Sequence, residues 1–205
     1  MPEVIINGPE GRIEAKYHHA KANAPVAIIL HPHPEEGGTM NDKITYALYR
    51  TFAHNGFNTL RFNFRGVGKS EGVFDEGEGE LSDAAAILDW LQAHHPNAPA
   101  SMQLLMRRPE LDGFIAVNPP ALAKDFTFLA PCPVSGLFIQ GDASTEELDS
   151  VKSLAATLTA QRNVFVTEKH VEGADSSFKN KFKNIMDLTN GYLKGGHQDG
   201  IAKSA

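Results

Sequence analysis

Short apolar runs alternate along the chain with longer segments whose apolar residues recur at helical spacing. Residues 25–30, PVAIIL, form a continuous apolar run, which is typical of a strand buried on both faces. Residues 41–55 place Ile44 and Leu48 one helical turn apart and end in an Asn-Gly pair, which predicts a helix with a C-terminal stop. Strands and helices that alternate in this way indicate an α/β fold with a mostly parallel sheet.

The same pattern places the other elements. Residues 11–18 alternate like a half-exposed antiparallel strand. Further strands are predicted at 57–64, 113–117, 134–140 and 163–171, and further helices at 80–95, about 145–160 and 179–193. We find no repeat and no interdomain linker in the sequence. We therefore expect a single domain over residues 1–194 and a flexible, Gly-rich tail over residues 195–205.

The composition narrows the classes of partner. The chain has 205 residues, of which 41% are hydrophobic and 21% charged, and its formal net charge is -6. An acidic balance argues against nucleic acid or an anionic membrane as the main partner. No signal architecture is evident at the start of the sequence, and Cys132 is a single cysteine, which fits a reducing cytoplasm. We expect Cys132 to be a buried structural thiol, and we predict no cofactor; the oligomeric state stays open.

Residues 68–72, GKSEG, match the G-x-S-x-G pattern around the nucleophile of many serine hydrolases. That nucleophile needs a strand that runs directly into a sharp turn and then into a helix. Here the predicted strand ends near Phe64 and the next helix begins near Glu80, so Ser70 is expected to be a loop residue. The stretch is not a phosphate-binding loop either, because that pattern requires glycine where Asn63 stands.

A second candidate stretch, HPHP, follows the buried strand at 25–30. Ligands of α/β folds bind at the carboxyl ends of such strands, so His31, Pro32 and His33 are predicted to form a pocket loop. Gly37 and Gly38 are expected to form a flexible turn beside the same pocket. Simple loop structure is the plainer alternative.

A metal site is a further alternative for the H-x-H pair, with the additional ligands to come from Asp142, His170 or Asp175. Our prediction is that there is no metal. Asp142 and Arg65 are placed at the pocket rim, although a surface salt bridge explains Arg65 equally well. The histidine pairs at 18–19 and 94–95 are expected to be exposed, and Trp90 is expected in the core.

LHPHPEEGGTMNDKI at 30–44 and LRFNFRGVGKSEGVFDEGEGELSDAAAILDWL at 60–91 strongly resemble small bacterial α/β hydrolases, single-domain serine hydrolases related to dienelactone hydrolases and short esterases. Residues 102–117 and 128–142 continue the match, which covers roughly residues 1–193. The resemblance implies a three-layer α/β-hydrolase-like fold and a Ser-Asp-His triad in chain order. It also implies an oxyanion loop at 31–33, where His33 would donate its backbone N–H because Pro32 has none.

The chain departs from this family at all three triad positions. The elbow is expected between the helix ending near His95 and the helix starting near 102, but PNAPAS at 96–101 is too short for a strand and a turn. The resemblance therefore implies that the central elbow strand and its nucleophile are deleted. The family's acid position holds Ser144, and its base position holds Ser176.

Without a triad, we expect an inactive or very weak relative of serine carboxylesterases. One alternative is a functional hydrolase of small esters, if a segment is missing from this sequence or other groups substitute. The other is a protein that binds a small-molecule ligand or a partner through the old pocket.

Overall fold

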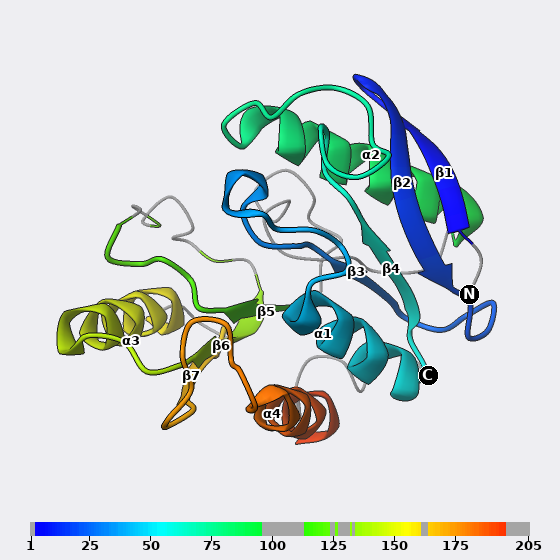
Figure 1. The fold of residues 1–205 in the computed structure, drawn as a ribbon. Helices are drawn as coiled ribbons and strands as arrows, with labels where there is room; N and C mark the ends of the chain where they lie inside the picture. Colours follow the sequence, from blue (N-terminus) through cyan, green and yellow to red (C-terminus); the bar gives the residue numbers. More distant parts are fainter. Residues whose placement is uncertain are drawn as a thin grey trace. The chain divides into compact units, whose positions relative to one another are not determined.

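The computed structural model describes residues 3–95, 113–123, 126, 132, 134–160 and 164–195. The chain divides into two compact units, Met1–Leu104 and Leu105–Ala205 (Figure 1). The single domain predicted over 1–194 therefore stays a prediction. Residues 96–101, where the elbow is expected, and the tail from 196 onward lie outside the described residues.

The first unit contains a four-stranded sheet in the order β1-β2-β4-β3. Its strands are β1 (Glu3–Gly8), β2 (Gly11–His18), β3 (Val26–Ile29) and β4 (Asn58–Phe62). β2 pairs antiparallel with β1 and with β4, whereas β3 and β4 are parallel. The β1–β2 hairpin closes with Gly8 opposite Gly11, and Gly11 takes the left-handed φ of 120° that favours glycine.

Two helices and one 3-10 turn complete this unit: η1 (Pro34–Glu36), α1 (Lys43–His54) and α2 (Glu78–His94). α1 begins where the Asp42 side chain accepts a hydrogen bond from the Ile44 N–H. α2 begins where the Glu80 carboxylate accepts a hydrogen bond of 2.8 Å from the Gly77 N–H. Every residue of β3 and of β4 is buried, so both strands contribute to the core of the unit.

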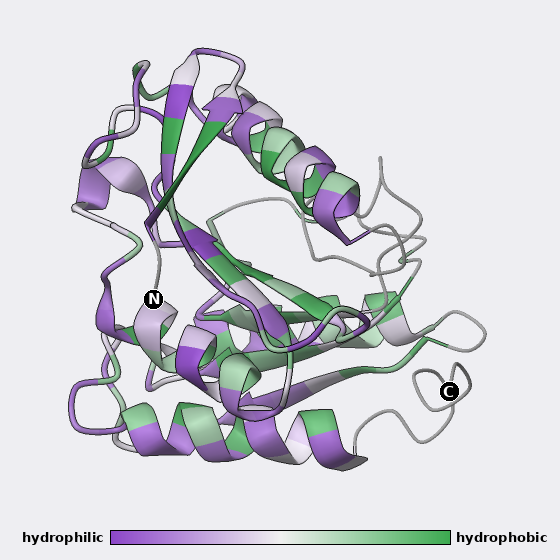
Figure 2. Cartoon of the chain, turned by 90° about the vertical axis from the view of Figure 1, so that its right-hand side faces the viewer, coloured by the Kyte–Doolittle hydropathy of each residue, from purple (hydrophilic) through white to green (hydrophobic). Residues whose placement is uncertain are grey.

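The second unit contains a parallel sheet in the order β5-β6-β7. Its elements are β5 (Gly113–Val117), β6 (Ser135–Gln140), α3 (Thr145–Thr159), β7 (Val166–His170) and α4 (Phe182–Gly195). β6 supplies the core residues Leu137, Phe138 and Ile139. A Cβ atom on Gly136 would lie 2.2 Å from the Phe114 ring, so only glycine allows the two strands to pack this closely. Figure 2 shows hydrophobic and hydrophilic residues on both the strands and the helices.

Each helix and strand predicted within the described residues is present, with ends shifted by a few residues, whereas the helix predicted to start near 102 lies outside them. β1 is an additional strand, and α2 begins two residues before the predicted start. The predicted burial of Cys132 is confirmed, and that of the strand at 25–30 is confirmed over β3. None of the helices in the described ranges is long and apolar enough to cross a bilayer.

Three burial predictions are wrong, and the first is that of His18, which is half-buried rather than exposed. His95 is 6% exposed because its ring packs against Tyr17, and its Nε2 forms a hydrogen bond with the Tyr17 hydroxyl. Trp90 is half-buried rather than in the core, since its ring lies between α2 and the strands beside an open hollow.

Candidate functional site

The HPHP loop begins at a buried histidine whose two ring nitrogens are both engaged. His31 Nε2 accepts a hydrogen bond of 3.0 Å from the Phe64 N–H, so Nδ1 carries the proton and donates to the Pro32 carbonyl at 2.6 Å. Burial lowers the pKa of His31. The neutral imidazole of His31 therefore has a structural role. Because both nitrogens are hydrogen-bonded, it offers no lone pair to a metal ion.

The turn after His31 is held in place by the backbone. The His33 carbonyl accepts hydrogen bonds from the N–H groups of Glu36 and Gly38, each at 3.1 Å. A Cβ atom on Gly38 would lie 2.1 Å from the Pro32 oxygen, whereas Gly37 has open space and a left-handed φ of 80°. Among the described residues we find no acceptor for the His33 N–H, so this group is available as a donor.

Arg65 is anchored in a buried ion pair. Its Nε and Nη2 bind the two carboxylate oxygens of Asp83 at 3.0 and 2.8 Å, and its backbone N–H donates to the same carboxylate. The Asp83 carboxylate raises the pKa of Arg65. The two side chains are 6% and 2% exposed, so the salt bridge left open as an alternative is present, but in the interior rather than at the surface. It fixes the loop after β4 to α2.

Ser70 is a structural loop residue, as predicted. It is 8% exposed, its hydroxyl donates to the Asn63 carbonyl at 2.7 Å, and it accepts from the Glu14 N–H at 3.0 Å. The Lys69 N–H donates to the Glu14 carboxylate, and Lys69 Nζ pairs with Glu3 at 2.6 Å. With both roles of the hydroxyl taken and α2 still eight residues away, Ser70 lacks the setting of a nucleophile.

In the second unit, the residue at the expected acid position starts a helix. Ser144 is the N-cap of α3: its hydroxyl accepts from the Glu147 N–H at 3.2 Å, and its own N–H donates to the Glu147 carboxylate at 2.8 Å. This is a capping box. The hydrogen bonds from Ser144 lower the pKa of Glu147.

The residue at the expected base position lies in a loop tied to the end of β6. The Ser176 carbonyl accepts from Asn118 Nδ2 at 2.8 Å, and Asn118 Oδ1 accepts from the Gly141 N–H at 2.9 Å. Asn118 holds a left-handed φ of 47°, which is uncommon outside glycine. One side chain thus joins the loops that carry the expected acid and base positions.

Asp142 pairs with His170, which the metal-site alternative had grouped with it. Its Oδ1 lies 3.1 Å from His170 Nε2, and its Oδ2 accepts from the Gly173 N–H at 2.9 Å. His170 ends β7 beside the end of β6, so neighbouring strands explain the contact. In the described parts of the chain no three His, Cys, Asp or Glu side chains converge on a point where a metal ion could bind.

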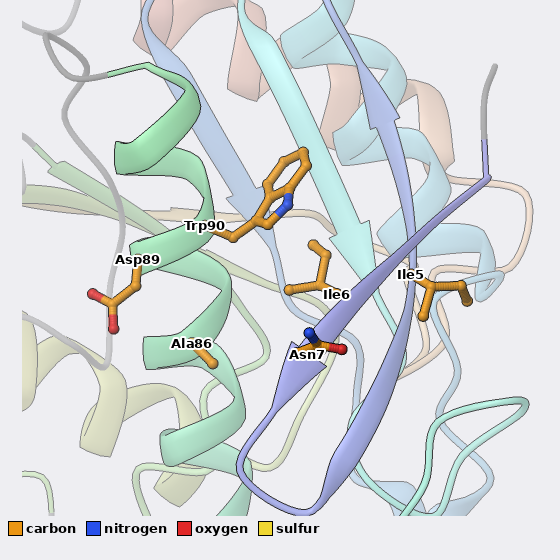
Figure 3. Close-up of a pocket in the computed structure, with 6 residues that line it drawn as sticks. All are labelled: Ile5, Ile6, Asn7, Ala86, Asp89 and Trp90. Carbon is orange, nitrogen blue, oxygen red and sulfur yellow. The ribbon is translucent and has the colours of Figure 1, made fainter.

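A hollow of about 380 Å³ lies between β1 and α2 (Figure 3). Its lining residues are Ile5, Ile6, Asn7, Ala86, Asp89 and Trp90. No serine or histidine lines it, and it is not at the carboxyl ends of parallel strands. It is therefore a surface feature separate from the predicted site.

Comparison with known proteins places this chain among hydrolases. The family model described as X-Pro dipeptidyl-peptidase (S15 family) matches residues 12–116, just over half of the chain. An uncharacterized protein of Rickettsia prowazekii is 45% identical over 211 residues, covering 94% of this chain and 89% of that protein.

Similar solved structures also belong to hydrolases. A protein of unknown function from Agrobacterium tumefaciens, described as an α/β hydrolase, is 47% identical with a TM-score of 0.89, covering 94% of this chain and 95% of that one. An α/β serine hydrolase homologue from Coxiella burnetii is 29% identical with a TM-score of 0.81, covering 94% and 97%. This chain has an α/β-hydrolase-like fold and belongs to the α/β serine-hydrolase family, within the group that the S15 family model describes.

Proposed function

We propose that this chain is an α/β-hydrolase-family protein that has lost the Ser-Asp-His triad and has no, or very weak, serine esterase activity. The observation that carries the proposal is the placement of Ser144. At the end of β6, where the family has a carboxylate, a serine hydroxyl caps α3 through the Glu147 N–H. A hydroxyl in that role cannot orient or stabilise a catalytic imidazolium.

Two further observations support this proposal. Ser70, the serine of the chain's G-x-S-x-G pattern, is buried, and its hydroxyl is bonded on both sides. The alignment with the Rickettsia protein spans 211 residues, more than the 205 of this chain, so that relative has residues that this chain lacks. A deletion that removes the elbow would account for such a gap.

The second candidate function is a working hydrolase of small esters in which other groups substitute. The His33 N–H remains a potential oxyanion donor, and the pair of Asp142 and His170 resembles the acid–base half of a triad. A role in small-molecule binding through the old pocket belongs to a third class. In each case we expect a protein of the cytoplasm that does not bind nucleic acid or membranes.

A fluorophosphonate probe and a short p-nitrophenyl ester separate these functions. We expect no labelled serine by mass spectrometry and no turnover above that of heat-unfolded protein. Ser70→Ala should behave like the unchanged chain in both assays. Labelling at any serine together with clear turnover would overturn the proposal, and turnover without labelling that is lost in His170→Ala would favour substitute groups.

A further inference from the structure

Two groups of three cations in the first unit differ in their partners. Arg12, Arg65 and Lys69 each form an ion pair with a carboxylate. In contrast, Lys16, Arg50 and Arg61 form no salt bridge among the described residues, although the charge of Lys16 contributes to lowering the pKa of Glu3. In a chain of net charge -6, three cations that form no salt bridge and surround one tyrosine are unexpected. The residues around the three cations indicate which kind of anion could balance their charge.

Arg61 is the buried member of this second group. Its side chain lies on β4 with 5% of the residue exposed, and its guanidinium carbon lies 5.0 Å from the ring centre of Tyr46 and 5.1 Å from that of Tyr49. Its Nη1 donates to the Met40 carbonyl and to Asn41 Oδ1. Its Nε is buried without an acceptor, which leaves a desolvated N–H unused.

The other two cations surround the same tyrosine. Lys16 is the register partner of Arg61 on β2, so neighbouring strands place both side chains on one face of the sheet. Arg50 follows Tyr46 by one helical turn on α1, and its Nη1 lies 3.4 Å from the Tyr46 hydroxyl. Tyr46 itself is 41% exposed, so the cluster opens to solvent.

Carboxylates on the neighbouring strands have other partners. Glu3 lies opposite Lys16 across β1 and β2, but its carboxylate binds Lys69 Nζ at 2.6 Å. The Glu14 carboxylate accepts from Asn63 Nδ2 and from the Lys69 N–H. Arg50, Arg61 and Lys16 together lower the pKa of Tyr46, with Arg50 contributing most.

We propose that Lys16, Tyr46, Arg50 and Arg61 form a binding site for a phosphate dianion, either inorganic or as the monoester of a small molecule. This set of residues is called the Tyr46 cluster below. Three cations that form no salt bridge match a dianion better than a single carboxylate. A tetrahedral oxyanion can also accept donors that arrive from two strands and a helix, whereas a carboxylate accepts in one plane.

Calorimetric titration of the whole chain at constant low ionic strength tests the site. Inorganic phosphate and phenyl phosphate should each bind with a Kd of about 1 mM, and acetate should bind more weakly. Arg50→Gln and Lys16→Gln should each weaken phosphate binding at least about threefold. Lys152→Gln removes the same charge from the exposed surface of α3 and should leave the Kd unchanged.

The phenol of Tyr46 gives a second readout that a general salt effect would not move. A bound dianion offsets the cations that lower the pKa of Tyr46, so phosphate should raise that pKa in an ultraviolet titration at fixed ionic strength. This shift should be absent in Tyr46→Phe. Equal weakening of binding by Lys152→Gln and Arg50→Gln, or an unchanged Tyr46 titration at saturating phosphate, would overturn the proposal. Far-UV circular dichroism confirms that each variant is folded.

Discussion

At Ser70 a single hydroxyl group connects β2 to the loop that follows β4. It accepts from the Glu14 N–H and donates to the Asn63 carbonyl, and both bonds are buried. Spacing alone predicted a loop residue, because no helix follows directly. Spacing could not name the two partners, since they lie 56 and 7 residues away along the chain.

His31 gives the first unit a pH-dependent contribution to its stability. Burial lowers its pKa in the folded state below the ordinary value of 6.5, so the folded protein binds fewer protons than the unfolded chain. The contribution is therefore fully present above about pH 6.5 and is lost as the pH falls through and below that value. Protonation would also set an Nε2–H against the Phe64 N–H.

We expect the free energy of unfolding to fall between pH 7 and pH 5 less steeply in His31→Gln than in the unchanged chain, because the glutamine oxygen can accept from Phe64 without titrating. Urea denaturation at a series of pH values measures this slope. His54→Gln, which replaces an exposed histidine on α1, serves as the control and should keep the slope. Identical slopes for His31→Gln and the unchanged chain would contradict this account.

At the scale of elements, Ser144→Ala removes the hydroxyl that caps α3. We expect a loss of about 1 kcal/mol in the free energy of unfolding, because the Glu147 N–H loses its acceptor. Thermal and urea denaturation measure the loss. Ser153→Ala, an exposed substitution in the middle of the same helix, should change stability by less than about 0.5 kcal/mol. Equal effects of both substitutions would show that the capping box contributes nothing.

Most elements were predictable because their local patterns agree with their final environment. β3 is apolar throughout and buried throughout, and α1 carries both a capping residue and a stop. β1 was not predicted, although EVIING followed by Pro-Glu-Gly is a plausible strand and turn. β1 is a strand because it pairs with β2. That pairing depends on the register between the two strands, which the pattern of β1 alone does not reveal.

At the scale of the whole molecule, the sequence identified the positions of the expected site but not the network around them. The resemblance supplied positions 144 and 176 by counting along motifs. It could not supply Asn118, which joins their loops, or the contact between Asp142 and His170. The Tyr46 cluster was also missed, because its members come from β2, α1 and β4 and share no motif.

Placing an acid at position 144 and a base at position 176 should not produce catalysis if the proposed loss of the nucleophile is correct. We expect Ser144→Asp combined with Ser176→His to show neither p-nitrophenyl ester turnover nor fluorophosphonate labelling, because an acid and a base without a nucleophile do not form a working triad. Ser144→Asp alone is the matched control. Turnover in the double variant but not in the control would show that a nucleophile remains elsewhere in the chain.

The cap on α3 also bears on how a chain with serine at position 144 can arise. Serine and aspartate are about equally good N-cap residues. An exchange between them at position 144 would leave the start of the helix intact and would affect only chemistry. Selection for a stable fold alone would then not distinguish serine from aspartate at position 144. Either residue can replace the other without an unstable intermediate.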